Sequence, residues 1–263
     1  MSWVVFDVGE VLIDESRIWS TWADVLRIPR LTFMGVLGGV IARGGELPDV
    51  FAALGQPSWQ RFEPRVQQRY GGFAAQDLYA DALPTLVALR AGGLRVGVVG
   101  NQPANRREEL LALGVDVDVM AMSDALGAAK PDPEFFARVR SLCGGAADIA
   151  YVGDRVDNDV EASAAAGMRA IWLRRGPWGL LQSDDTGASA AVCWDLREVA
   201  DVLLIGPCPT CGGRLQRLVY GKPGPSASLE RFLQRGSTVL AGCLRGDATH
   251  RCVDCRKEVI ATA

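Results

Sequence analysis

Five residues spread over most of this 263-residue chain have the types and spacing that phosphoryl transfer requires. Asp7 and Asn101 each follow an apolar run, Lys130 precedes a Pro-Asp-Pro sequence, and Asp154 and Asp159 share one acidic segment. A carboxylate can attack phosphorus and form an aspartyl phosphate. Acidic oxygens can bind Mg²⁺, and lysine and amide groups can bind phosphoryl oxygens. Together these residues indicate a phosphoryl-transfer site.

The elements that must position these residues alternate between strands and helices. The expected strands are Trp3–Val8, Leu94–Val99, Val117–Met122, Ile149–Gly153 and Met168–Leu173. The expected helices are Tyr79–Ala91, Pro103–Leu113, Pro133–Leu142 and Val156–Ala166. This alternation predicts an α/β fold with a parallel sheet covered on both faces. Ligands bind outside the carboxyl ends of such strands, where Asp7, Asn101 and Asp154 fall.

One segment, residues 14–77, interrupts the alternation with mostly helical patterns. It begins just after Asp7 and ends before the helix expected from Tyr79. We interpret it as a helical insertion above the carboxyl edge of the sheet, either a structural subdomain or a lid that excludes water. The expected domains are therefore an α/β core (1–13 and 78–205), a helical cap (14–77) and a C-terminal domain (206–263).

The order and spacing of the motifs resemble the haloacid dehalogenase (HAD) superfamily from residue 3 to about residue 180. The resemblance implies a Rossmann-like sheet with the first strand central and a helical cap after the first motif. It also implies that Asp7 is the nucleophile. The implied Mg²⁺ ligands are Asp7, the backbone carbonyl of Gly9 and Asp154, with Asp159 orienting metal-bound water.

The same resemblance implies a phosphoryl-binding group made of Asn101, Lys130 and the backbone N–H of Gly100. Asp132 and Pro133 are a natural N-cap and first helical residue, which places Lys130 in the turn before a helix. In isolation, Lys130 would be read as a solvated surface lysine, so its assignment depends on the other motifs.

Two positions depart from the usual HAD pattern. Gly9 stands where most family phosphatases have an aspartate that protonates the leaving group, and Gly100 stands where a Ser or Thr is expected. Loss of a general acid typically costs ~10²–10⁴-fold in rate. A substrate with a good leaving group, such as an acyl or aryl phosphate, would need less protonation. A nearby acid could also substitute, and the candidates are Glu10, Asp14 and Glu15.

The C-terminal segment carries two Cys-x-x-Cys pairs. The four candidate ligands are Cys208, Cys211, Cys252 and Cys255. Four thiolates in this arrangement suit tetrahedral Zn²⁺, and the segment resembles a zinc ribbon with two metal-binding turns. A short helix is expected at Ser226–Arg235. Cys243 and His250, the one histidine of the chain, lie nearby and could displace a ligand, but a packed Cys and a surface His are the simpler interpretation.

Charge is distributed unevenly along the chain. Residues 206–263 carry nine Lys or Arg and four Asp or Glu, a net charge of +5, so the remainder carries −8 of the total of −3. The basic segment could attract an acidic protein or carrier, or dock on the acidic body. We expect no nucleic-acid partner, because the segment lacks an aromatic stacking platform. The N-terminus shows no signal peptide and we find no membrane span, so we expect a cytoplasmic location.

The sequence therefore predicts a Mg²⁺-dependent HAD-like phosphohydrolase acting on a small phosphorylated metabolite, with structural Zn²⁺ in its tail. Two alternatives remain open. The chain could be a binding or scaffold protein that keeps the fold and metal site. It could also catalyse a phosphoryl- or acyl-transfer step in a specialised pathway, with the ribbon contacting a carrier.

Overall fold

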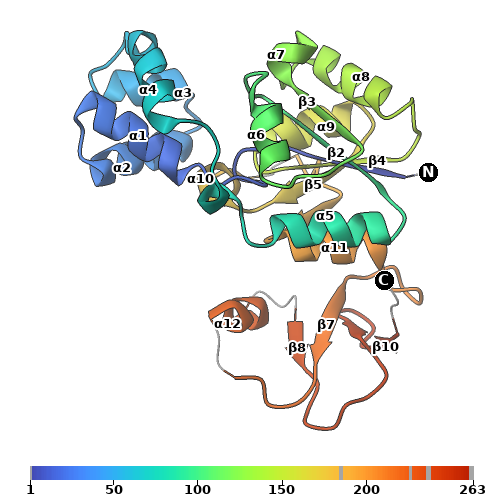
Figure 1. Cartoon of the computed structure of the whole chain (residues 1–263). Coiled ribbons are helices and arrows are strands. Elements are labelled where there is room, and N and C mark those ends of the chain that lie inside the picture. The colour runs from blue at the N-terminus through green and yellow to red at the C-terminus, as the bar shows by residue number, and fades with distance from the viewer. Residues whose placement is uncertain (1, 184–185, 225–226, 235–237, 261–263) are drawn as a thin grey trace. The chain divides into compact units, whose positions relative to one another are not determined.

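The computed structural model describes residues 2–183, 186–224, 227–234 and 238–260 (Figure 1). The chain divides into two compact units, Met1–Leu196 and Arg197–Ala263. In the part of the chain that the structure describes, no helix is long and apolar enough to cross a membrane.

A six-stranded parallel sheet forms the centre of the first unit (Figure 1). Its strands are β1 (Trp3–Phe6), β2 (Arg95–Gly100), β3 (Val119–Met122), β4 (Ile149–Gly153), β5 (Arg169–Leu173) and β6 (Ala191–Cys193). The strand order is β3-β2-β1-β4-β5-β6, and β1 pairs in parallel with both β2 and β4. The expected α/β class and the central first strand are confirmed. All four residues of β1 and all five of β4 are buried, as expected for strands covered on both faces.

Helices and helical turns connect the strands. They are α5 (Ala82–Ala91), α6 (Arg106–Ala112), α7 (Ser123–Leu126), α8 (Pro133–Leu142), the π-helical turn η3 (Val156–Val160), α9 (Glu161–Ala165) and α10 (Gly176–Leu181). Asp132 caps α8 by accepting a hydrogen bond from the backbone N–H of Glu134 at 2.8 Å, and Pro133 is its first residue, as the sequence predicts. Lys130 therefore lies in the turn before α8.

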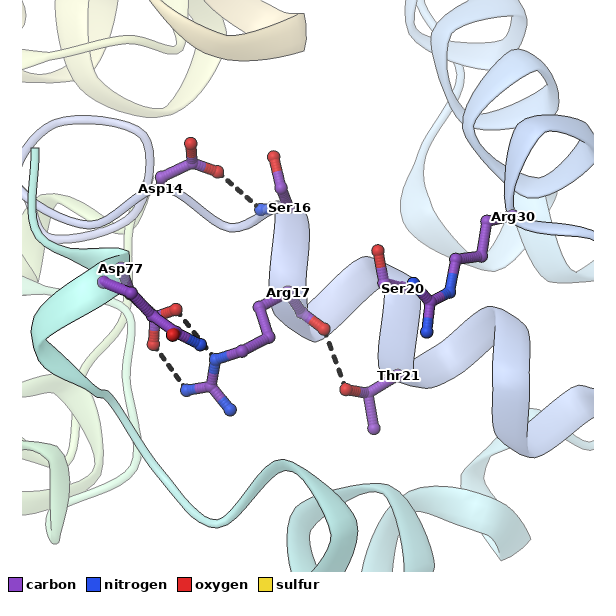
Figure 2. A pocket seen from close by; sticks show the side chains of 8 residues that line it. Asp14, Ser16, Arg17, Ser20, Thr21, Arg30 and Asp77 are labelled. Carbon is purple, nitrogen blue, oxygen red and sulfur yellow. Dashed lines mark hydrogen bonds and ion pairs between the residues drawn. The ribbon is translucent and has the colours of Figure 1, made fainter.

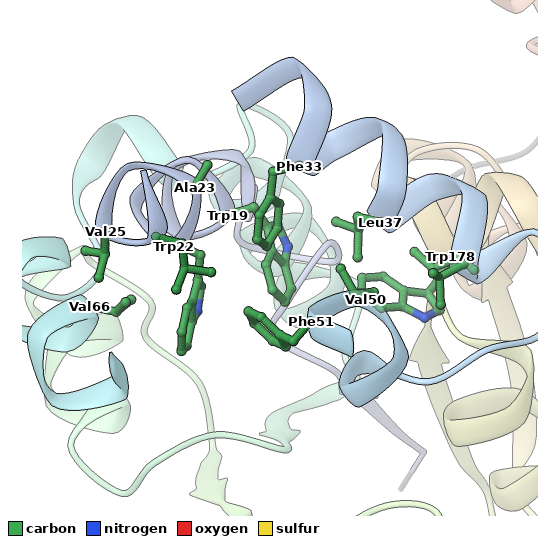
Figure 3. Close-up of a cluster of buried hydrophobic side chains, with 13 residues drawn as sticks. Trp19, Trp22, Ala23, Val25, Phe33, Leu37, Val50, Phe51, Val66 and Trp178 are labelled. Atoms are coloured by element: carbon green, nitrogen blue, oxygen red, sulfur yellow. The ribbon is translucent and has the colours of Figure 1, made fainter. Parts of the chain in front are cut away.

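The insertion after β1 is helical. It contains α1 (Ser16–Leu26), α2 (Arg30–Ile41), α3 (Leu47–Ala53), η1 (Trp59–Phe62), α4 (Glu63–Tyr70) and the turn η2 (Ala75–Asp77). Figure 3 shows its core, where Trp22 packs against Phe51 with ring centroids 4.8 Å apart. The core is completed from outside the insertion by Trp178 of α10, whose ring centroid lies 6.2 Å from that of Trp19. The indole of Trp178 therefore joins the insertion to the segment after β5.

The second unit contains α11 (Leu196–Leu204, which begins at the boundary) and a four-stranded sheet of order β10-β9-β7-β8. Its strands are β7 (Leu215–Val219), β8 (Thr238–Leu240), β9 (His250–Cys252) and β10 (Glu258–Val259). Strands β7 and β8 are parallel and are connected through α12 (Ala227–Gln234), close to the helix expected there. Strands β9 and β10 form an antiparallel hairpin.

Candidate active site and cysteine cluster

Three aspartates converge at the carboxyl edge of the sheet, beyond the neighbouring strands β1 and β4. Asp7 follows β1, Asp154 follows β4, and Asp159 lies in η3. One carboxylate oxygen from each lies within 4.8 Å of the others, and all three residues are buried. The indole N–H of Trp172 donates to the backbone carbonyl of Asp154 at 3.0 Å and so fixes the chain there. Hard oxygen donors at this spacing suit a divalent cation such as Mg²⁺.

Lys130 neutralises two of the three carboxylates. Its ammonium lies 2.8 Å from Asp7 Oδ1 and 2.6 Å from Asp159 Oδ1. Burial alone would lower the pKa of Lys130, but Asp159 and Asp7 outweigh burial and hold this pKa well above its ordinary value. Lys130 is therefore a buried, charged residue and not a solvated one.

The acids of the cluster are hard to ionise together. Burial raises the pKa of Asp154 well above its ordinary value, and the charges of Asp159 and Asp7 raise it further. Burial also raises the pKa of Asp159 to about 6, although Lys130 opposes this shift. In the described part of the chain, no Lys or Arg side chain forms an ion pair with Asp154. A buried acid with negative neighbours and no paired cation is suited to bind a metal ion.

The Asn101 side chain forms two hydrogen bonds with the backbone of Lys130. Its amide N–H donates to the backbone carbonyl of Lys130 at 2.9 Å, and its amide oxygen accepts from the backbone N–H of Lys130 at 2.8 Å. These two bonds tie the end of β2 to the turn before α8. In the structure Asn101 therefore positions Lys130, and contact between its amide and a phosphoryl oxygen stays a prediction.

Two glycines allow the acids to come so close. A Cβ on Gly100 would lie 2.3 Å from Asp7 Oδ1, so a Ser or Thr there would collide with the carboxylate as it is placed. A Cβ on Gly153 would lie 2.3 Å from Cγ of Asp159. Gly100 therefore costs the site a hydroxyl donor but leaves space for the Asp7 carboxylate.

Gly9 also borders a carboxyl group. A Cβ on Gly9 would lie 2.4 Å from Oε1 of Glu15. Burial raises the pKa of Glu15 to about 8, with the charges of Glu10 and Asp7 adding to the effect. Glu10 has a positive φ of 52° and accepts a hydrogen bond from the Tyr79 hydroxyl at 2.6 Å. The sequence named Glu10, Asp14 and Glu15 as candidates, but spacing along a loop could not select among them.

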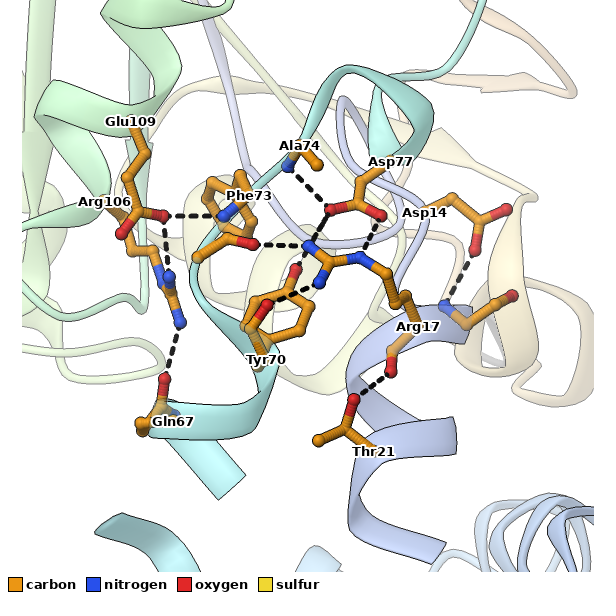
Figure 4. A network of polar contacts seen from close by, with 12 residues as sticks. Asp14, Arg17, Thr21, Gln67, Tyr70, Phe73, Ala74, Asp77, Arg106 and Glu109 are labelled. Atoms are coloured by element: carbon orange, nitrogen blue, oxygen red, sulfur yellow. Dashed lines mark hydrogen bonds and ion pairs between the residues drawn. The ribbon is translucent and has the colours of Figure 1, made fainter. Parts of the chain in front are cut away.

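A polar network joins the two chain crossings between core and insertion (Figure 4). Arg17 of α1 forms an ion pair with Asp77 and donates to the carbonyl of Tyr70 at 2.6 Å. Arg106 of α6 donates to Gln67 of the insertion at 2.7 Å. Figure 2 shows a polar cleft beside this network, lined by Asp14, Ser16, Arg17, Ser20, Thr21, Arg30, Gln76 and Asp77. Of the residues that the sequence named for the site, Asp14, a candidate replacement acid, lines that cleft, and Asp7, Asn101, Lys130, Asp154 and Asp159 do not.

The four predicted cysteines converge in the second unit. Each offers a sulfur atom within 4.8 Å of the other three. The Sγ–Sγ distance is 3.7 Å between Cys208 and Cys255, and 3.5 Å between Cys211 and Cys252. Cys252 and Cys255 lie at the turn of the β9–β10 hairpin, where the N–H of Cys252 donates to the carbonyl of Lys257 at 2.8 Å. Cys243 and His250 lie outside this four-cysteine cluster.

The chain belongs to the haloacid dehalogenase-like hydrolase family, whose family model matches residues 1–167. It is 34% identical over 110 residues to a glyceraldehyde 3-phosphate phosphatase of Methanopyrus kandleri, covering 40% of this chain and 47% of that protein. It is 32% identical over 167 residues to a phosphoserine phosphatase of Thermus thermophilus, covering 62% of this chain and 58% of that protein. The chain thus spans about half the length of these relatives.

Solved structures support the same fold. The HAD-hydrolase YfnB of Bacillus subtilis, described as bound to magnesium, has a TM-score of 0.61 at 16% identity and covers 77% of this chain and 98% of its own. A β-phosphoglucomutase-like protein of Thermotoga maritima has a TM-score of 0.59 at 21% identity and covers 77% and 98%. At these identities the likeness concerns the fold alone.

Proposed function

We propose that this chain is a Mg²⁺-dependent phosphohydrolase that acts on a small phosphorylated metabolite through an aspartyl phosphate on Asp7. The observation that carries the proposal is the buried cluster of Asp7, Asp154 and Asp159 with the Lys130 ammonium bridging two of them. Its relatives with phosphatase names support the reaction class.

The donor set fits a magnesium ion. Asp7, Asp154 and the backbone carbonyl of Gly9 would hold it, and it would neutralise charge on the phosphoryl group. Asp7 attacks phosphorus, while Lys130 balances charge on Asp7 and is within reach of a phosphoryl oxygen bound beside it. Asp159 fixes the Lys130 ammonium from the other side. Asn101 holds the Lys130 backbone, and the N–H of Gly100 is offered to the phosphoryl group.

Asp7→Asn tests this proposal directly, because it removes the nucleophile and keeps the size of the side chain. We expect turnover of aryl, acyl and sugar phosphates with Mg²⁺ to fall by at least about 10⁴-fold. The thermal melting curve should show that the variant is folded. Equal activity in the variant would contradict the proposal, and no turnover by the unmodified chain would favour the scaffold alternative.

For the second unit, we propose a structural Zn²⁺ site formed by Cys208, Cys211, Cys252 and Cys255. Zn–S bonds of about 2.3 Å in a tetrahedron place the sulfur atoms about 3.8 Å apart. The observed pairs at 3.5 and 3.7 Å match this spacing. Metal analysis should find one zinc per chain, and finding none with free thiols would contradict the site. We further propose that this basic unit contacts an acidic protein or carrier.

A further inference from the structure

We propose that Glu15 supplies the general acid and base that Gly9 does not provide, and that the substrates therefore include phosphate monoesters of alkyl alcohols. This inference rests on the proposed phosphohydrolase function and names the proton donor of that same site. The proposed proton donor comes from the start of the insertion and not from the motif that carries Asp7.

The Glu15 carboxyl lies beside Gly9. The three atoms nearest to a Cβ built on Gly9 all belong to Glu15: Oε1 at 2.4 Å, Cδ at 2.9 Å and Cγ at 3.6 Å. The carboxyl group thus occupies the space where a side chain at position 9 would begin, two residues after the nucleophile. Gly9 is the residue type that leaves this space to Glu15.

The surrounding contacts hold Glu15 in this place. Its backbone N–H donates to Glu10 Oε1 at 3.1 Å, and its carbonyl accepts from the backbone N–H of Trp19 at 3.1 Å. Trp19 is 8% exposed, and its indole faces the Glu15 carboxyl, where a hydrogen bond from Trp19 opposes the rise in the pKa of Glu15.

The two rival acids are engaged elsewhere. Glu10 accepts hydrogen bonds on both carboxylate oxygens, from the backbone N–H of Glu15 and from the Tyr79 hydroxyl. Asp14 accepts from the backbone N–H of Ser16 at 2.8 Å and so caps the start of α1. Neither acid supplies the atoms nearest to the missing side chain of Gly9.

The proton transfers balance over two steps. First, Asp7 Oδ1 or Oδ2 forms a bond to phosphorus while the bond from phosphorus to the alkoxide oxygen breaks, and the Glu15 carboxyl gives its proton to that oxygen to yield the alcohol. Second, the Glu15 carboxylate takes a proton from water as the water oxygen attacks phosphorus. The bond between phosphorus and Asp7 then breaks, which releases phosphate and restores both side chains.

The consequence for substrate class is specific. An alkoxide is a poor leaving group and needs a proton as it departs, whereas a p-nitrophenolate departs without one. A site without an acid would accept aryl or acyl phosphates alone, while a site with Glu15 in place accepts alkyl phosphates also.

The experiment compares Glu15→Gln with unmodified chain over a series of phosphate monoesters, from p-nitrophenyl phosphate to glycerol phosphates. We expect alkyl-ester turnover to fall by about 10²–10⁴-fold. The first-turnover burst of p-nitrophenol should fall by less than about 10-fold, because that step does not need the proton. In Glu15→Gln the rate should thus fall steeply as the pKa of the leaving alcohol rises, whereas in the unmodified chain it should fall little. Asp14→Asn is the matched control and should behave like the unmodified chain.

A swap variant keeps the test decisive if Glu15→Gln folds poorly. Gly9→Asp combined with Glu15→Ala moves the acid to position 9 and removes the collision, and should regain alkyl-ester turnover at least 10-fold over Glu15→Ala. If Glu15→Gln loses burst amplitude and alkyl-ester turnover equally, or keeps normal alkyl-ester turnover, the proposed role of Glu15 is wrong. Either result would leave the proposed phosphohydrolase function standing. Absence of any phosphate-ester turnover by the unmodified chain, or full activity of Asp7→Asn, would overturn the proposed function with it.

Discussion

The chain holds two clusters of metal-binding type. The fold holds the acidic cluster together, whereas the cysteine cluster would hold its fold together. The acidic cluster of Asp7, Asp154 and Asp159 lies at the end of strands buried on both faces. The four-cysteine cluster lies beside strands of two to five residues in a small unit. In the first unit, packing of the sheet brings like charges together at a cost that Lys130 partly offsets. In the second, little apolar surface is available, so the proposed metal would itself hold the fold together.

Removing the proposed zinc ion should therefore have the largest effect, and this effect should stay within the second unit. Structural zinc contributes an apparent ~10–16 kcal/mol in small domains. We expect Cys252→Ser, or a strong chelator, to unfold residues 197–263 and to leave residues 1–196 folded. Limited trypsin digestion with mass spectrometry measures this, since the second unit is rich in arginine.

Cys243→Ser is the matched control, because Cys243 is exposed and lies outside the four-cysteine cluster. Its digestion pattern should equal that of the unmodified chain. If both units became protease-sensitive together in Cys252→Ser, the proposed independence of the two clusters would be wrong.

Breaking the charge balance of the acidic cluster should have the next largest effect. Lys130→Met leaves Asp7 and Asp159 buried without their cation, and removal of one partner of a buried pair typically costs ~3–5 kcal/mol. Urea unfolding measures the loss. Added Mg²⁺ should recover part of it. Arg138→Met, which removes an exposed pair with Glu134 on α8, is the control and should change stability by less than about 1 kcal/mol.

The dependence of stability on pH should reveal the raised pKa of the buried Glu15 carboxyl. Its folded-state pKa of about 8 lies above its ordinary value of 4.5, so between these values the unfolded chain releases a proton that the folded chain keeps. The Glu15 carboxyl therefore lowers the free energy of unfolding by a few kcal/mol as pH rises from about 4.5 to 8. In metal-free buffer, Glu15→Gln should gain in Tm relative to the unmodified chain as pH rises from 5 to 8. Parallel Tm curves for the two proteins would refute the burial effect.

The smallest effect is expected from an exposed ion pair beside the cysteines. Arg251 pairs with Glu258 across the β9–β10 hairpin at 2.6 Å. Exposed pairs are typically worth 0.2–1 kcal/mol. Arg251→Ala should thus shift the zinc-loaded unfolding midpoint very little. A loss as large as that of Cys252→Ser would mean that side-chain pairing, and not the metal, holds the hairpin.

The sequence predicted the elements that have strong local signals. The five long strands follow from Val- and Ile-rich runs, and the start of α8 follows from Asp132 and Pro133. Strand β6 was missed because three residues, Ala191–Cys193, carry too little pattern to separate a strand from a loop. Helix α10 was missed because its six residues include two glycines and a proline.

The sequence predicted which residues form the candidate site, but not which atoms of these residues contact one another. Motif order named Asp7, Lys130, Asp154 and Asp159, which the structure brings together. It could not show that Asn101 bonds the Lys130 backbone, because that contact depends on how two loops meet. Nor could it show that Glu15 fills the space beside Gly9, since a flexible side chain six residues further along can lie in many places.

The indole of Trp178 has a mechanical consequence for the insertion. Two chain crossings alone would define a hinge axis about which the insertion could rotate freely. Beyond the crossings and the hydrogen bond from Arg106 to Gln67, Trp178 adds an attachment from α10, and Arg155 adds a weaker one through its ion pair with Glu46 at 3.8 Å. Rotation about this axis would therefore require the Trp178 indole to leave the apolar core of the insertion. The segment after β5 thus restrains rotation of the helical insertion.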